Sequence, residues 1–319
     1  MHGRRRLNGV AAVVLCASLA LAGCAVSEGP ERPKVDAITE TSSAGEAPPE
    51  ALALIGRALE DDRLTDAERL MDRIMLTHPR SLEARLLRGE ILLAKGQPDQ
   101  AMSVFSGLKD LPEVSTRARQ GLGIAMMLTG APDPAAEHLK AAVEADPSLW
   151  RAWNALGSYY DTKEDWAESN EAYALALAER PNDPMILNNR GFSYFMQDRL
   201  DEAIADIERA LHLDPELTPA QYNLRLAHAW SGRYVRALSG ATDAELPRVL
   251  NNIGYVAMLR GDYDNAEAYL MRAMEVDPTF NETAWQNLAR LRNMRELGAV
   301  ETGGLPATPR DVTAAVPGE

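Results

Sequence analysis

Small and apolar residues recur along this chain at a fixed period of 34 residues. Alanines that precede helix-like runs keep this spacing from Ala67 to Ala237, with Ser169 in the same phase, and Ala266 follows after 29 residues. A period of this length predicts a stack of similar supersecondary units, none of which can bury its apolar face alone. In the same phase stand the glycines Gly89, Gly123, Gly157, Gly191 and Gly254, and the prolines Pro79, Pro147, Pro181, Pro215 and Pro278, with Pro112 one place early.

The clearest unit spans residues 150–183 and reads WRAWNALGSYYDTKEDWAESNEAYALALAERPND. We expect two antiparallel helices in each unit, and Pro181 ends the second because proline cannot continue the hydrogen-bond ladder. Small residues such as Gly157 and Ala176 let the helices of a pair approach closely. The large residues Trp153, Tyr160 and Tyr173 are expected to fill the space between neighbouring pairs, and Gly96, Gly130, Gly232 and Gly261 mark the turns. The seven units start near residues 48, 82, 116, 150, 184, 218 and 247.

This unit resembles the tetratricopeptide repeat, whose pattern begins W-x2-L-G-x2-Y and ends with a proline. The matching residues are Trp153, Leu156, Gly157, Tyr160, Tyr173, Ala176 and Pro181. The resemblance implies an all-α fold, a right-handed superhelical solenoid of about seven helical hairpins over residues 48–297. We expect a C-terminal capping helix at about 281–297, with Asn281 and Gly298 as its caps, and a disordered tail at 298–319.

Two units depart from the pattern. The unit from 218 has Arg225 where glycine is expected, and Ser239, Gly240 and Pro247 interrupt its second helix. We therefore expect a local break or kink in the solenoid at this unit. The first unit has Ile55 at the glycine position and no aromatic residue, as is typical of a terminal cap.

The N-terminus predicts export from the cytoplasm. Three arginines at 4–6 precede an apolar stretch at 10–21 of about 12 residues, too short to span a bilayer core that needs roughly 20. Residues 21–24, Leu-Ala-Gly-Cys, resemble the bacterial lipobox. The resemblance implies that residues 1–23 are a lipoprotein signal peptide and that Cys24 is the lipidation site. The alternative is an ordinary secretory signal with an accidental cysteine.

Residues 24–47 are rich in Pro, Ser, Glu and Gly, so we expect a lipidated flexible tether. In enterobacterial lipoproteins, aspartate after the lipidated cysteine marks retention in the inner membrane. Ala25 resembles the outer-membrane class instead. The expected location is therefore the cell envelope, with the body anchored to the outer membrane by lipid and facing the periplasm.

Charge and cysteine content narrow the classes of partner. The net charge is −14, and removal of residues 1–23, with three arginines and no acid, would make it −17. Such acidity argues against nucleic acid, because phosphate binding needs clustered Lys and Arg. It favours basic or neutral protein partners, or serves solubility alone. Only Cys16 and Cys24 are present, which excludes a disulfide or a cysteine-ligated metal in the body.

The resemblance to tetratricopeptide proteins implies a binding site, because such proteins commonly bind extended peptides in a concave groove lined by the first helix of each unit. The sixth position of successive units faces that groove and holds Asn189, Asn223 and Asn252, then Gln286. A ladder of amides both donates to and accepts from a peptide backbone. The alternative is that these amides only support helix packing or are solvated. Neighbouring residues expected to shape the pockets are Asn154, Asn188, Asn251, Tyr222, Phe192, Phe195 and Tyr255.

Catalysis finds no support in the sequence. The five histidines are scattered, and no H-E-x-x-H, G-x-S-x-G, P-loop or G-x-G-x-x-G motif occurs. The carboxylates Asp201, Glu202, Asp206 and Glu208 are expected on solvated helix faces. We therefore expect no enzyme activity, no cofactor, no metal site and no small-molecule substrate.

Residues 187–215 and 249–278 resemble the TadD family, tetratricopeptide lipoproteins of the tight-adherence (Flp) pilus system. Their sequences are LNNRGFSYFMQDRLDEAIADIERALHLDP and VLNNIGYVAMLRGDYDNAEAYLMRAMEVDP. The resemblance implies a role in assembling the pilus secretion channel, in the manner of a secretin pilotin. One alternative is an adaptor that recruits peptidoglycan hydrolases or other envelope-assembly factors. A hydrolase with repeat decoration would need a second globular domain, for which no unassigned stretch is long enough.

Overall fold

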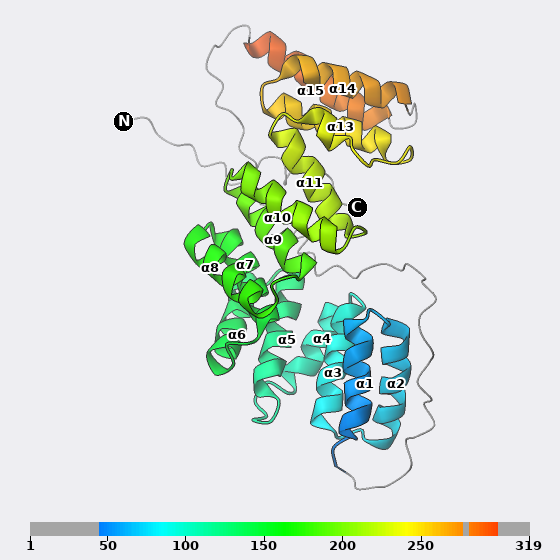
Figure 1. Cartoon of the computed structure of the whole chain (residues 1–319), viewed down its shortest axis with the longest axis vertical. Coiled ribbons are helices and arrows are strands. Elements are labelled where there is room, and N and C mark those ends of the chain that lie inside the picture. The colour runs from blue at the N-terminus through cyan, green and yellow to red at the C-terminus, as the bar shows by residue number, and fades with distance from the viewer. Residues whose placement is uncertain (1–44, 277–280, 299–319) are drawn as a thin grey trace. The chain divides into compact units, whose positions relative to one another are not determined.

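A computed structural model describes residues 45–276 and 281–298, and all the regular elements within these ranges are helices (Figure 1). The described residues belong to two compact units, one ending at Pro181 and the other beginning at Asn182. The signal peptide, Cys24, most of the tether and residues 299–319 lie outside the described residues.

The first compact unit contains four helical hairpins. Its helices are α1 (Pro49–Glu60), α2 (Leu64–Thr77), α3 (Leu82–Ala94), α4 (Pro98–Ser106), α5 (Ser115–Leu128), α6 (Pro132–Ala145), α7 (Trp150–Lys163) and α8 (Trp166–Glu179). The second compact unit contains three more hairpins and a last helix. Its helices are α9 (Pro184–Met196), α10 (Leu200–Leu213), α11 (Thr218–Trp230), α12 (Tyr234–Ala237), α13 (Leu246–Leu259), α14 (Tyr263–Val276) and α15 (Asn281–Gly298). Each odd-numbered helix up to α13 opens a repeat, within two residues of the expected start.

The turn inside every hairpin contains one residue with positive φ. Glycine holds this position at Gly96, Gly130, Gly232 and Gly261, with φ between 68° and 79°. Glycine suits it because it has no Cβ to clash in the left-handed region. The other three hairpins place Asp62, Glu164 and Asp198 there, with φ of 54°, 61° and 60°. The repeat therefore fixes the backbone shape of the turn even where glycine is missing.

Glycine in the first helix of a hairpin makes room for one large side chain of the second helix. A Cβ built on Gly157 would lie 2.7 Å from the ring of Tyr173, and one built on Gly191 would lie 2.6 Å from Ile207. The expected close approach within a pair is therefore present. The expected place of Tyr173 between neighbouring pairs is wrong, because its ring is buried inside its own hairpin against Gly157.

The N-terminal boundary of the fold differs slightly from the expected one. Glu46 accepts hydrogen bonds from the Ser81 hydroxyl at 2.5 Å and from the Leu82 backbone N–H at 3.0 Å. Ala47 is buried against the first hairpin. These last two residues of the expected tether belong to the folded body, because the Glu46 carboxylate satisfies groups at the start of α3.

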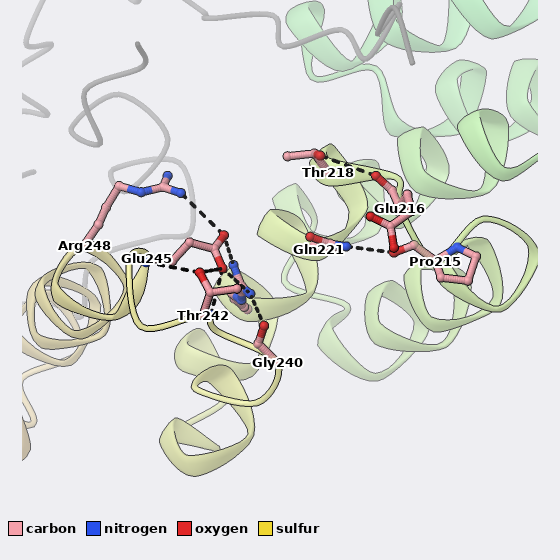
Figure 2. A network of polar contacts seen from close by, with 9 residues as sticks. Pro215, Glu216, Thr218, Gln221, Gly240, Thr242, Glu245 and Arg248 are labelled. Carbon is pink, nitrogen blue, oxygen red and sulfur yellow. Dashed lines mark hydrogen bonds and ion pairs between the residues drawn. The ribbon is translucent and has the colours of Figure 1, made fainter. Parts of the chain in front are cut away.

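The sixth hairpin is interrupted where the sequence predicts a break. Its second helix, α12, has only 4 residues, whereas α8 and α10 have 14 each. The Arg225 guanidinium donates to the Gly240 carbonyl at 3.0 Å and to the Glu245 carboxylate at 3.2 Å. Glu245 also accepts from the Thr242 backbone N–H at 3.0 Å, and these groups lie together in Figure 2. A polar network thus takes the place of the missing turns of helix.

Candidate protein-binding site

The predicted groove residues lie mainly in the second compact unit. Asn154, on α7, belongs to the first compact unit, and all the others are on α9, α11, α13 or α15. Successive first helices touch in this unit, α9 with α11, α11 with α13 and α13 with α15. Their amide side chains are therefore brought to neighbouring positions on adjacent helices.

Two hydrogen bonds between amides join these helices. Asn223 donates to the Asn188 side-chain oxygen at 2.9 Å, and Asn287 donates to the Asn251 oxygen at 3.0 Å. Asn188 and Asn251 in turn each donate to the following asparagine at 3.4 Å. In each pair of adjacent asparagines, 188–189 on α9 and 251–252 on α13, the first residue thus forms the hydrogen bond to the next repeat.

Burial separates the predicted residues into two groups. Asn188 has no exposed surface and Phe195 is 1% exposed, so in this structure both side chains lie beneath the surface that a peptide could reach. Asn251 is 5% exposed, and three further residues are each 8% exposed, namely Asn154, Asn189 and Tyr255. The second group is half-buried and consists of Asn223, Asn252, Phe192 and Tyr222.

Gln286 does not continue the amide ladder. Its side chain is exposed and donates to Glu282 on its own helix at 3.2 Å. Asn287, which the sequence analysis missed, makes the contact with α13 instead. The sequence did offer a signal, since Asn287 directly follows the predicted groove position at Gln286. Which of the two amides contacts α13 depends on the rotation of α15 about its axis.

The half-buried ring of Phe192 packs against buried aromatic side chains. It stacks on Phe195, with ring centroids 6.0 Å apart, and Phe195 meets Trp230 edge-on at 6.4 Å. Such contacts hold rings in defined orientations. Phe192 therefore offers a rigid apolar contact on the same helix as Asn189, which suits recognition of an apolar side chain on an extended peptide.

The carboxylates of α10 do not all lie on a solvated face, contrary to expectation. Asp206 is buried and accepts two hydrogen bonds from Arg190, at 2.6 and 2.9 Å. This bidentate pair connects α9 with α10 inside the fifth hairpin. Asp206 therefore has a structural partner, and its burial excludes the solvated position that the helix pattern predicts.

Residues 45–276 and 281–298 contain no cluster of three or more His, Cys, Asp or Glu side chains suited to a metal ion. Within the same ranges, no helix is both long enough and apolar enough to cross a membrane. The predicted groove residues therefore offer hydrogen bonding by amides and apolar contact by aromatic rings.

Stacked helical hairpins with a face of partly buried amides and aromatic rings define a helical-repeat protein built for interaction with other proteins. The chain belongs to the tetratricopeptide repeat family. Four models of this family match it, at residues 58–111, 121–184, 184–217 and 247–280. None of these four matches covers residues 218–246, which form the interrupted hairpin.

Several characterised proteins share this repeat. The chain is 28% identical over 152 residues to the BBSome complex member BBS4 of Bos taurus, covering 48% of this chain and 29% of that protein. It is 36% identical over 72 residues to the peroxisomal targeting signal receptor of Saccharomyces cerevisiae, covering 23% and 12%. The chain thus spans less than a third of the length of these relatives. The structure of the APC/C hetero-tetramer Cut9-Hcn1 shares the fold, with a TM-score of 0.57 and 19% identity over 75% of this chain and 52% of that one.

Proposed function

We propose that this tetratricopeptide scaffold is anchored by lipid on Cys24 to the bacterial outer membrane and assists assembly of the Flp pilus secretion channel from the periplasm. One feature of the chain carries the proposal, namely a lipobox-like sequence at 21–24 that precedes a tetratricopeptide body on the same chain. The resemblance of residues 187–215 and 249–278 to TadD lipoproteins points to the pilus system. The scaffold would act by binding proteins, without catalysis.

The location and the partner are tested together by crosslinking in intact cells. The wild-type chain should fractionate with the outer membrane and capture a secretin, whereas Cys24→Ala should release it from membranes because the acyl anchor is lost. Continued tight membrane association of Cys24→Ala would exclude the lipid anchor. Capture of peptidoglycan hydrolases without a secretin would replace the pilus role with an adaptor role.

The contribution of the amide face is tested by a matched pair of substitutions on α13. Asn252 is half-buried and accepts only a long hydrogen bond, 3.4 Å, from Asn251. Asn252→Ala should therefore weaken partner capture while lowering the unfolding free energy by only about 0.5 kcal/mol. Asn251→Ala removes the acceptor of Asn287 and should lower the unfolding free energy by about 1 kcal/mol. Undiminished capture by Asn252→Ala would show that this amide does not contact the partner.

A further inference from the structure

Two cavities occupy equivalent places in two repeats that are two periods apart. The smaller, of about 200 Å³, lies beside α7 in the first compact unit, and the larger, of about 430 Å³, lies beside α11 in the second. Each residue that lines the smaller cavity has a counterpart 68 residues later in the larger one, as Tyr160 and His228 illustrate. Each cavity is bordered by the second helix of the preceding hairpin and by its own hairpin.

Side-chain size explains why the second cavity is larger. Trp153 of the smaller cavity is replaced by Gln221, and Tyr160 by His228. In the sixth hairpin, helix α12 ends at Ala237, so Gly240 of the following loop borders the cavity. In the fourth hairpin, the equivalent residue is Ala172, which lies within α8. The interrupted hairpin has therefore gained a cavity large enough for a side chain and part of a peptide backbone.

Charge distinguishes the two cavities more sharply than size. Glu168 borders the smaller cavity at the position where Arg236 borders the larger, and Lys140 stands where Glu208 stands. Arg236 is exposed and forms no ion pair with a carboxylate of the described residues. It therefore retains its capacity to bind an anionic group in two parallel hydrogen bonds.

His228 is a buried polar residue in the wall of the cavity. It is 95% buried, and its Nδ1 atom has no hydrogen-bond partner among the described residues. Burial lowers the pKa of His228, and the positive charges of Arg236 and Arg233 act in the same direction against the opposing charge of Glu208. The imidazole is therefore neutral at pH 7, which leaves Arg236 as the cation that can attract an anionic group to this wall.

One cation that borders the larger cavity is left without an ion pair among the described residues, namely Arg236. Arg225 already donates to Gly240 and Glu245, and Gln221 donates to the Pro215 carbonyl at 2.7 Å. Glu208 is the only carboxylate among the lining residues. Leu211 and Leu224 provide apolar surface between them. An acceptor-rich group on a small apolar body fits this combination.

We propose that the cavity beside α11 binds a carboxylate-bearing peptide segment of a partner protein, either an acidic side chain or a C-terminal carboxylate. Arg236 pairs with the carboxylate, Leu211 and Leu224 contact the adjoining apolar side chain, and Glu208 accepts a backbone N–H. This site is separate from the amide face of α9, α11 and α13. The equivalent cavity beside α7 has Glu168 in place of Arg236 and Lys140 in place of Glu208, so it lacks this arrangement.

Three acetylated tetrapeptides test the proposal by isothermal titration calorimetry on the full chain. The first, Ala-Ala-Leu-Glu-amide, has a side-chain carboxylate, and the second, Ala-Ala-Leu-Ala, has a free C-terminus. The third, Ala-Ala-Leu-Gln-amide, has no carboxylate. At least one of the first two should bind about tenfold more tightly than the third, which corresponds to one charge-assisted hydrogen-bonded pair. The better binder identifies the source of the carboxylate.

Arg236→Gln should abolish the preference for a carboxylate without unfolding the chain, because Arg236 is exposed and makes no ion pair. Arg248→Gln is the matched control, since Arg248 is also exposed but does not border the cavity. It should keep the full preference. Equal affinity for all three peptides, or an undiminished preference in Arg236→Gln, would overturn the proposal. Asn252→Ala, which tests the amide face, should leave these peptide affinities unchanged.

Discussion

The fourth and sixth hairpins keep the same period but fill their interiors in different ways. In the fourth, the Tyr173 ring packs on Gly157, and its hydroxyl donates to Asp161 at 2.9 Å. In the sixth, Arg225 replaces the glycine and donates to Gly240 and Glu245. The comparison teaches that a repeat survives loss of most of its second helix when charged hydrogen bonds replace the apolar contact between its helices.

The largest effect is expected from closing the space in the fourth hairpin. In Gly157→Ala, the new Cβ would lie 2.7 Å from the buried Tyr173 ring, so the ring or the helix must shift. Overpacking of this kind should lower the unfolding free energy by about 2 kcal/mol, measured by chemical denaturation followed by far-UV circular dichroism.

Gly56→Ala is the matched control for this prediction. Gly56 also lies within a helix, α1, but a Cβ there meets no atom within 4 Å. The substitution should raise the unfolding free energy by about 0.5–1 kcal/mol through helix propensity. Equal destabilisation by both substitutions would mean that the contact with Tyr173 is not what requires glycine at 157.

A smaller and pH-dependent effect is expected from the polar network of the sixth hairpin. Hydrogen bonds from the Thr242 backbone and from Arg225 lower the pKa of Glu245 to about 2 from its ordinary 4.5. Because the folded-state pKa is lowered, this stabilisation is present above pH 4.5 and is lost as the pH falls towards 2. Glu245→Gln should therefore lower the unfolding free energy by about 1–2 kcal/mol at neutral pH, and by progressively less towards pH 2.

Glu275→Gln provides the control for the acid titration. Glu275 forms an ion pair with Arg272 at 3.1 Å, but both side chains are at least 60% exposed. Exposed pairs of this type contribute little, so the substitution should change the unfolding free energy by less than about 0.5 kcal/mol at any pH. A difference between wild type and Glu245→Gln that stays constant down to pH 2 would contradict the assignment to the Glu245 carboxylate.

The smallest effect on the unfolding free energy is expected at the turn between the two helices of each hairpin. This turn has the same backbone conformation in the fourth and sixth hairpins, but a different residue occupies it. Glu164 has a φ of 61° where the sixth hairpin has Gly232 at 76°. Glu164→Gly should remove strain and raise the unfolding free energy by about 0.5–1 kcal/mol. Glu171→Gly, inside α8, should instead lower it by about 1 kcal/mol, because glycine is unfavourable within a helix. Destabilisation by both substitutions would show that the turn at Glu164 is unstrained.

The sequence was sufficient to predict the helical hairpins, their starts and the interrupted one. These features depend on local signals, because glycine, proline and alanine in a fixed phase determine where helices begin, end and approach one another. The positive φ of Asp62, Glu164 and Asp198 was not predicted, because an aspartate or a glutamate in a turn does not by itself indicate a left-handed backbone. Counting 34 residues back from Gly96 reaches Asp62, forward from Gly130 reaches Glu164, and back from Gly232 reaches Asp198.

The partners of the amides could not be predicted in the same way. Asn188 bonds to a residue 35 positions later and Asn251 to one 36 positions later, so neither contact follows the 34-residue period. These contacts depend on how adjacent helices rotate and slide, which local patterns do not encode. The sequence analysis singled out Arg225 and Gly240, but the hydrogen bond between them depends on the path of the interrupted chain.

The connections between Asn223 and Asn188 and between Asn287 and Asn251 have a consequence for how the protein responds to its surroundings. A carboxamide carries no charge at any ordinary acidity, and dissolved ions do not screen a bond between two of them. These joints will therefore hold equally well in dilute and in saline media. The two amide contacts differ in this respect from the ion pair of Arg295 with Glu267, which connects α15 with α14 and weakens as salt is added.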